Sequence, residues 1–269
     1  MSSSAPEGSR RRLEVSSSRG LKALRVSALV VALGFLAVAT AAQSPREANP
    51  ERPTYATHAY AVAPGYAELE QGISARGIHS LGDATSWDVN LKFGLSAWAQ
   101  FALFGPLYLR GPGGGGVGDL GAALKIRGDL SRRTALAFVS SLTVPTGDAA
   151  RGLGAGRSLG GLTGVVSTDL PGGIHLDINA GPQGIGTGAP QWFTSLSGAY
   201  GHGAAGITLE ALTFTAGAAG RRFAGLLGAL TLRIVPWAVA DAGGVLHAAP
   251  GSPNQVFVGL TTNLGRVVP

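Results

Sequence analysis

His175, Asp177 and Asn179 are the residues whose types and spacing come closest to catalytic chemistry. A histidine beside a carboxylate is the minimum of a hydrolase site, in which the imidazole takes a proton from a nucleophile. Residues two apart share one face of a β-strand but lie ~7 Å from each other. This spacing predicts no direct bond between His175 and Asp177. We therefore expect a hydrogen-bond network here and no enzyme activity.

Sites for a cofactor or a metal ion are not expected either. Gly152, Gly154 and Gly156 form a G-x-G-x-G segment, but a dinucleotide-binding loop needs a helix directly after it, and no helical pattern follows these glycines. The five histidines do not fall at the spacing of metal ligands, and the chain contains no cysteine. We interpret the glycine segment as an external loop.

Charged side chains point to a different chemistry, the selection of solutes in a pore. They recur at positions that alternate with apolar residues. The candidates for the lining of a lumen or its constriction are Glu68, Glu70, Asp88, Lys92, Asp119, Lys125, Arg127, His175, Asp177, Glu210 and Asp241. Two interpretations stay open: these charges select passing solutes in a wide lumen, or they neutralise one another in a narrow one.

Strands must position these side chains, because hydrophobicity alternates along the chain with a period of two. In residues 86–95 every odd-numbered residue is apolar and every even-numbered residue is polar or Gly, which indicates a strand with two chemically different faces. Similar patterns predict twelve strands near residues 66–76, 86–95, 99–104, 117–127, 134–144, 159–169, 174–180, 192–200, 206–215, 223–233, 238–246 and 255–264. The register over 134–169 stays open, since one strand there is apolar on both faces and the next is Gly-rich.

Alternation alone fits both a soluble sandwich, with its apolar face inward, and a membrane barrel, with its apolar face outward. Three features favour the barrel. The polar face carries charges strand after strand, the predicted turns are alternately short and long, and Trp98, Trp192 and Trp237 lie near strand ends, where an interfacial girdle needs them. We predict an all-β fold, a transmembrane antiparallel up-and-down β-barrel of about twelve strands with short periplasmic turns. The residues expected to face lipid include Leu91, Phe93, Leu124 and Leu176.

The net charge of +6 would suit a nucleic-acid-binding protein, but the distribution of charge does not. Residues 1–42 hold six basic and two acidic groups, which leaves 15 basic and 13 acidic groups in the remainder. The basic stretch precedes an apolar run over 26–42 that ends in small residues, the order of a cleaved signal peptide; an uncleaved helical anchor is the alternative. We predict a signal peptide over 1–42, an extended periplasmic lead-in over 43–63 and an outer-membrane barrel over 64–269, with no nucleic-acid partner.

Five short segments, kept in order, carry a family resemblance. They are NPERPT at 49–54, APGYAELEQG at 63–72, KFGLS at 92–96, GVGDLGAALK at 116–125 and LTVPTGD at 142–148. Together they resemble the outer-membrane transporter family of the phenol-degradation meta-pathway type, found in Gram-negative bacteria. Thr262 and Leu264 stand where such proteins usually carry aromatic residues in the last strand. The resemblance implies a β-barrel transporter.

The expected function is a passive outer-membrane channel or transporter for small molecules, with hydrophobic or aromatic solutes implied only by the resemblance. The alternative is a non-transporting structural or surface-interaction barrel whose charged lumen is closed. The expected partners are outer-membrane lipids, the barrel-assembly machinery and a small-molecule solute. Since twelve strands lie between side-chain-filled small barrels and open porins, the sequence leaves both functions open.

Overall fold

The computed structural model describes residues 45–77, 84–111, 113–218, 222–248 and 254–268. All of them belong to the larger of two compact units of the chain, residues 38–269. The predicted signal peptide over 1–42 lies outside the described residues. No helix in the described part of the chain is long and apolar enough to cross a membrane.

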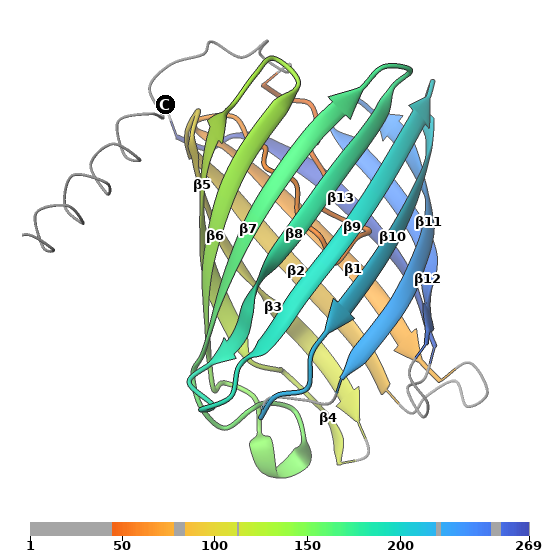
Figure 1. Cartoon of the computed structure of the whole chain (residues 1–269). Coiled ribbons are helices and arrows are strands. Elements are labelled where there is room, and N and C mark those ends of the chain that lie inside the picture. Colours follow the sequence, from red (N-terminus) through yellow and green to blue (C-terminus); the bar gives the residue numbers. More distant parts are fainter. Residues whose placement is uncertain (1–44, 78–83, 112, 219–221, 249–253, 269) are drawn as a thin grey trace, which may run out of the picture. The chain divides into compact units, whose positions relative to one another are not determined.

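Twelve antiparallel strands of the described chain close into a barrel (Figure 1). Each strand pairs with its neighbours along the chain, and the last strand pairs with the first. The strands are β1 (Tyr66–Arg76), β2 (Ala84–Ser96), β3 (Ala99–Gly111), β5 (Leu120–Asp129), β6 (Thr134–Val144), β7 (Leu159–Leu170), β8 (Ile174–Ile185), β9 (Gln191–His202), β10 (Ala205–Phe214), β11 (Phe223–Val235), β12 (Ala238–His247) and β13 (Gln255–Arg266). A shorter strand, β4 (Gly114–Gly116), only extends the end of β3. The predicted fold class is confirmed.

Strand bounds follow the prediction closely except at the ends of two strands. The strand predicted over 174–180 continues as β8 to Ile185, and β3 is the more informative case. The strand predicted over 99–104 continues as β3 to Gly111, because Gly105 and Pro106 do not end it. The β2–β3 ladder shifts register at Asp88, the residue opposite Pro106. A β-bulge accommodates a proline, which cannot donate to the ladder, so the strand continues past the end that was predicted for it.

The two faces of the barrel wall differ as the alternation predicted. Lys92 is fully buried inside the barrel, so its neighbours Leu91 and Phe93 point outward. On β11, Ala229 is buried whereas Leu230 is 65% exposed. Large exposed apolar side chains occur on strands all around the wall: Leu103, Leu124, Phe138, Ile178, Leu196, Leu209, Leu226, Leu246 and Val258. Such an outer surface suits lipid, and the soluble sandwich is excluded.

The connections differ at the two ends of the barrel. At one end, the short-turn end, adjacent strands are joined by two to four residues. At the other, the long-loop end, which is at the bottom of Figure 1, the connections are longer and include the 3-10 turn Ala149–Arg151. Trp98 and Trp237 are exposed beside short turns, and Trp192 is exposed at the long-loop end. These positions match the interfacial girdle expected from the sequence.

The residues before β1 differ most from the sequence-based expectation. Instead of an extended lead-in outside the barrel, residues 45–63 lie inside it, as the orange trace in Figure 1 shows. Ala48 N donates to Pro236 O at a short turn, and Gly65 N donates to Gly94 O where β1 begins (2.9 and 2.8 Å). The chain therefore enters at the short-turn end, folds back within the barrel and returns to the same end. We call residues 45–63 the lumen segment.

Candidate functional site

Side chains of the barrel wall hold the lumen segment by its backbone. Regular secondary structure is absent from this part of the described chain, so its buried N–H groups need other acceptors. Seven of them donate to wall side chains at 2.6–3.0 Å: Asn49 to Glu68, Glu51 to Glu70, Tyr55 and Ala56 to Glu210, Thr57 to Asn179, Ala59 to Ser167, and Val62 to Gln100. These acceptors come from five strands, β1, β3, β7, β8 and β10, so the segment is fixed from several sides.

Lys92 is the centre of one buried charge group. Its Nζ lies 2.6 Å from a Glu68 oxygen and 2.8 Å from Glu70 Oε1, and it donates to the Asn49 carbonyl at 3.0 Å. A buried ammonium is tolerated only when its charge and its donors are satisfied. Because Glu68 and Glu70 also accept from backbone N–H groups of the lumen segment, this group joins β1, β2 and the segment.

Lys125 is the centre of a second group, and most of its partners belong to the lumen segment. Its Nζ donates to Glu51 Oε1, Thr57 Oγ1 and the His58 carbonyl at 2.5, 2.8 and 2.8 Å. Burial alone would raise the pKa of Glu51, but the ammonium groups of Lys125 and Lys92 hold it far below its ordinary value. The Glu51 carboxylate therefore stays charged at neutral pH.

Arg52 crosses the lumen to a third wall position. Its Nε and Nη2 lie 3.2 Å from the two oxygens of Asp241 on β12. The guanidinium also packs against Gly72 and Gly259, where an added Cβ would stand 2.4 and 2.3 Å from Arg52 atoms. These two glycines, which face each other across β1 and β13, leave the room that the arginine occupies.

His175 and Asp177 do form the direct bond that strand geometry argued against. Nε2 of His175 lies 3.0 Å from Asp177 Oδ1, and Nδ1 lies 2.7 Å from Asp169. The expectation from ~7 Å spacing was wrong because side chains two apart lean toward each other along the strand. Ser167 donates to Asp177 instead of to His175, and it accepts from Ala59 N. The arrangement therefore positions the lumen segment through Ser167.

Of the remaining candidates from the sequence, Arg127 contacts the lumen segment, whereas Asp88 and Asp119 bind other parts of the chain. Arg127 pairs with Asp129 and lies over the Tyr60 ring, with its Cζ 5.5 Å from the ring centroid. Asp88 accepts from Ser86 within β2. Asp119 lies before β5, and its carboxylate accepts from Gly147 N and Ala155 N at 3.0 and 2.7 Å. Asp119 therefore holds the long loop over 145–158 and does not belong to the groups that contact the lumen segment.

Sequence reasoning missed the residues on the lumen segment itself. Glu51, Thr57 and His58 supply the partners of Lys125, and Arg52 is the partner of Asp241. A signal was present, because Lys92 and Lys125 on the inward face needed more opposite charge than their own strands supply. Uncharged wall residues that hold the segment, Ser167, Asn179, Gln100 and Asn263, gave no such signal.

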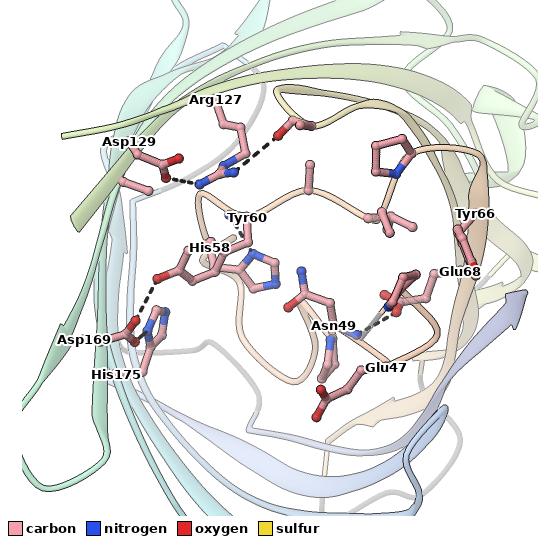
Figure 2. Close-up of a pocket in the computed structure, with 18 of the residues that line it drawn as sticks. Glu47, Asn49, His58, Tyr60, Tyr66, Glu68, Arg127, Asp129, Asp169 and His175 are labelled. Atoms are coloured by element: carbon pink, nitrogen blue, oxygen red, sulfur yellow. Dashed lines mark hydrogen bonds and ion pairs between the residues drawn. The ribbon is translucent and has the colours of Figure 1, made fainter. Parts of the chain in front are cut away.

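Two cavities remain beside the lumen segment. A cavity of about 1200 Å³ opens at the short-turn end and is lined by Asn49, His58 and Tyr60 of the segment and by Arg127 of the wall, among others (Figure 2). A smaller cavity of about 310 Å³ lies against Tyr55, Phe104 and Lys125. The lumen is thus occupied but not filled.

The inward face near the long-loop end is apolar over β9 to β13. The side chains Phe193, Leu212, Leu227, Val245 and Phe257 are buried there and pack with Phe214 and Phe223. Aromatic rings on neighbouring strands contact one another, with 4.8 Å between the centroids of Phe193 and Phe214 and 5.9 Å between those of Phe214 and Phe223. The lining candidates taken from the sequence were all charged or ionisable residues, so this apolar wall was not expected.

Solved structures with the same fold include an outer membrane channel and two porins. An outer membrane channel from Pseudomonas putida F1 matches with a TM-score of 0.58 and 14% identity, over 81% of this chain and 100% of that one. The KdgM porin, solved with disordered oligogalacturonate, has a TM-score of 0.54 and 6% identity, over 72% of this chain and 98% of its own.

The NanC porin also has a TM-score of 0.54, with 8% identity over 74% of this chain and 100% of its own. No protein-family model matches the chain, and no curated protein matches its sequence. The chain therefore has the fold of outer-membrane channels and porins.

Proposed function

We propose that this protein is a passive outer-membrane channel for small molecules whose lumen is closed, in the state described, by its own lumen segment. The fold shared with outer-membrane channels supports the location and the class of function. On this proposal, the signal peptide directs export, the barrel-assembly machinery inserts the strands, and lipids contact the apolar outer face.

The observation that carries the proposal is the way in which the lumen is closed. The barrel wall is continuous, whereas the lumen segment is held by side-chain hydrogen bonds and ion pairs without entering the sheet. Each neutral hydrogen bond of this kind exchanges with water at modest cost, whereas the buried ion pairs hold the segment more strongly. Displacing the segment toward the short-turn end would open a lumen lined by Lys92, Lys125 and Glu210.

The solute class is proposed to be hydrophobic or aromatic. The apolar wall over β9 to β13, with Phe193, Phe214, Phe223 and Phe257, supports this choice because a lumen for strongly hydrated solutes has no need of buried aromatic rings. The resemblance of five sequence segments to the outer-membrane transporter family of the phenol-degradation meta-pathway type supports the same class.

A closed structural barrel is the second candidate, and one observation favours it. Lys92 and Lys125 are fully paired with carboxylates, as a permanently closed lumen requires. This candidate predicts that the lumen segment never leaves its site and that the barrel conducts nothing.

Planar-bilayer recordings of the full-length protein and of a variant lacking residues 45–63 separate the two candidates. We expect small or rare conductance from the full chain and a large, steady conductance from the deletion variant, since the strands themselves are intact. Heat-modifiable migration on a gel checks that both proteins are folded. A folded deletion variant without any conductance would contradict the channel and favour the structural barrel.

A further inference from the structure

The smaller of the two cavities lies between the lumen segment and the barrel wall over β2 to β6. Its volume is about 310 Å³; the segment contributes Tyr55 and Thr57 to its lining, and the wall contributes Phe104, Ala123 and Ser141, among others. The hydrogen bonds and ion pairs that hold the segment do not require an empty space at this place. The cavity is therefore a candidate site for a ligand.

Small side chains on three neighbouring strands create this space. Ala102 on β3 pairs with Ala123 on β5, and Ala123 pairs with Ser141 on β6, so all three lie in one row of the inner face. Along β9 to β13, by contrast, the inward side chains near the long-loop end are large, apolar and buried. The lumen near that end is therefore filled along β9 to β13 and open along β3 to β6.

Solvent reaches the lining of this cavity. Phe104, Ala123 and Ser141 are only partly buried, and so is Thr143, the next inward residue of β6 toward the long-loop end. The exposed surface thus continues from the cavity toward that end of the barrel. A molecule that enters there reaches these side chains while the lumen segment is seated.

Most polar side chains of the lining already have partners. Tyr55 Oη donates to Gln255 at 3.1 Å, and Thr57 Oγ1 accepts from Lys125 at 2.8 Å. The Ser141 hydroxyl, in contrast, makes no hydrogen bond to any described residue and stays in contact with solvent. What remains for a ligand is apolar surface with few free polar groups, of which the Ser141 hydroxyl is one.

The charges at the lining compensate each other. Only Glu51 and Lys125 carry charge among the described residues that line the cavity, and Glu51 Oε1 lies 2.5 Å from Lys125 Nζ and 4.0 Å from Lys92 Nζ. Lys92 is shared further with Glu68 and Glu70, which do not line the cavity. An anion would therefore meet Glu51, and a cation would meet Lys125, after giving up its water at a high cost. The lining thus favours an uncharged molecule.

We propose that this cavity binds one small uncharged molecule with an apolar body and a hydrogen-bonding group, and that it does so while the lumen segment is seated. The Phe104 ring and the Ala123 methyl group provide apolar contact, and the Ser141 hydroxyl provides a hydrogen bond. Ligand cavities in proteins begin at about 300 Å³, so the space suits a molecule near the lower end of the ligand size range. Its identification as the transported solute rests on the proposed function, whereas the site itself requires no conduction.

Thiol labelling measures the occupancy of the site, because the chain has no cysteine of its own. Ala123→Cys places one thiol on the lining, and Arg157→Cys places one at an exposed position of the loop over 145–158 as the control. Each full-length variant, in detergent, is treated with methyl methanethiosulfonate alone or together with benzyl alcohol, benzoate or benzylammonium. These three molecules share a ring and differ in charge. Mass spectrometry gives the labelling rates.

Benzyl alcohol at about ten times its Kd should slow the labelling of Ala123→Cys about tenfold, because occupied protein is shielded, and it should leave Arg157→Cys unchanged. Benzoate and benzylammonium should require at least about tenfold higher concentrations, since each must give up the hydration of its charge. Equal protection by all three molecules, or stronger protection by either ion, would overturn the uncharged class. Absence of labelling at Ala123→Cys under every condition would show that solvent does not reach the cavity and would overturn the site.

Ser141→Leu and Ser140→Leu, each added to Ala123→Cys, locate the binding. The first substitution fills the cavity, whereas the second places the same side chain on the outward face of the same strand. Protection by benzyl alcohol should be lost with Ser141→Leu and kept with Ser140→Leu, and heat-modifiable gel migration checks that both proteins are folded. Protection that persists in both, or that is absent from Ala123→Cys itself, would refute the site.

Failure of the site and failure of the channel give different results. Unprotected Ala123→Cys, in a protein whose variant lacking residues 45–63 conducts, would refute the site and leave the channel intact. Protection of Ala123→Cys, together with a deletion variant that never conducts, would support the site and refute the channel.

Discussion

The two lysines that follow the predicted signal peptide, Lys92 and Lys125, both lie buried in the lumen. Each is surrounded by carboxylates and carbonyls, and Glu51 of the lumen segment takes part in both groups, at 4.0 Å from Lys92 and 2.5 Å from Lys125. Removing one partner of a buried pair leaves an uncompensated charge, whereas a solvent-exposed pair contributes little. The stability of the lumen segment in its site therefore depends far more on its buried charged residues than on its exposed ones.

Glu51→Gln should destabilise the seated lumen segment by about 3–5 kcal/mol, because Lys125 loses its charged partner. Glu47→Gln is the matched control on the same segment. Glu47 pairs with Arg233, whose side chain is 51% exposed, so its loss should cost under about 1 kcal/mol.

Amine acylation followed by mass spectrometry measures the effect of Glu51→Gln, since a released segment exposes Lys92 and Lys125 to the reagent. Equal labelling of these lysines in the Glu51 and Glu47 variants would mean that the buried pair does not hold the segment.

Acid should release the lumen segment through His58. Its pKa falls to about 4 when buried, against an ordinary value of 6.5. The released state therefore binds more protons between these values. The stability that the neutral His58 gives the seated state, complete above pH 6.5, is lost as the pH falls toward 4. Glu51, whose pKa is lowered, adds to this loss only below its ordinary value of 4.5.

We expect the open probability of single channels to rise between pH 6.5 and pH 4. In His58→Gln, which has no proton to gain, the rise should be absent from this range. An unchanged pH response in His58→Gln would assign the release to other groups.

Among the elements, the lumen segment and the strands are held by different forces. The strands form continuous antiparallel ladders, whereas the backbone N–H groups of the segment donate hydrogen bonds to wall side chains such as Ser167 and Glu210. Ala59 N donates to Ser167 Oγ at 2.7 Å, so these two residues lie next to each other. Both side chains are small and fully buried. This pair of positions is therefore suited to an engineered disulfide between the segment and the wall.

A disulfide in Ala59→Cys/Ser167→Cys should keep the lumen closed. The chain has no cysteine of its own, so no other disulfide competes. We expect oxidised protein to show no openings in bilayer recordings and reduced protein to regain them, with Ser167→Cys alone unaffected by oxidation. Openings of the same size and frequency in the oxidised double variant would show that solutes pass without moving this part of the segment.

At the scale of the whole molecule, the barrel places apolar side chains toward lipid and polar ones toward the lumen. Ala123 and Leu124 show the contrast on β5, since Ala123 lines the cavity of about 310 Å³ and Leu124 is 40% exposed on the outer face. An arginine near the middle of a lipid-facing surface costs about 2–4 kcal/mol. An arginine that enters a polar cavity avoids most of that cost.

Leu124→Arg should therefore lower the folding stability by about 2–4 kcal/mol, and Ala123→Arg by clearly less. Urea-dependent folding into lipid vesicles, followed by tryptophan fluorescence and gel migration, measures both. Equal losses in the two variants would contradict the assignment of these faces.

Local patterns in the sequence determined the barrel. Alternation in residues 86–95 and its counterparts placed the strands and their faces, because each strand's periodicity depends only on its own residues. Turn residues likewise separated short from long connections. The extension of β3 through Pro106 escaped prediction, since a bulge opposite Asp88 depends on the partner strand.

The occupation of the lumen was decided only by the tertiary structure. Glu51 and Lys125 are 74 residues apart, and Tyr55 and Glu210 are 155 apart, so their contacts exist only once the barrel has closed. Residues 45–63 show no periodicity of their own that would place them inside or outside. Their position depends on inward-facing carboxylates, amides and lysines that belong to many strands. These side chains contact one and the same segment only after the barrel has closed around it.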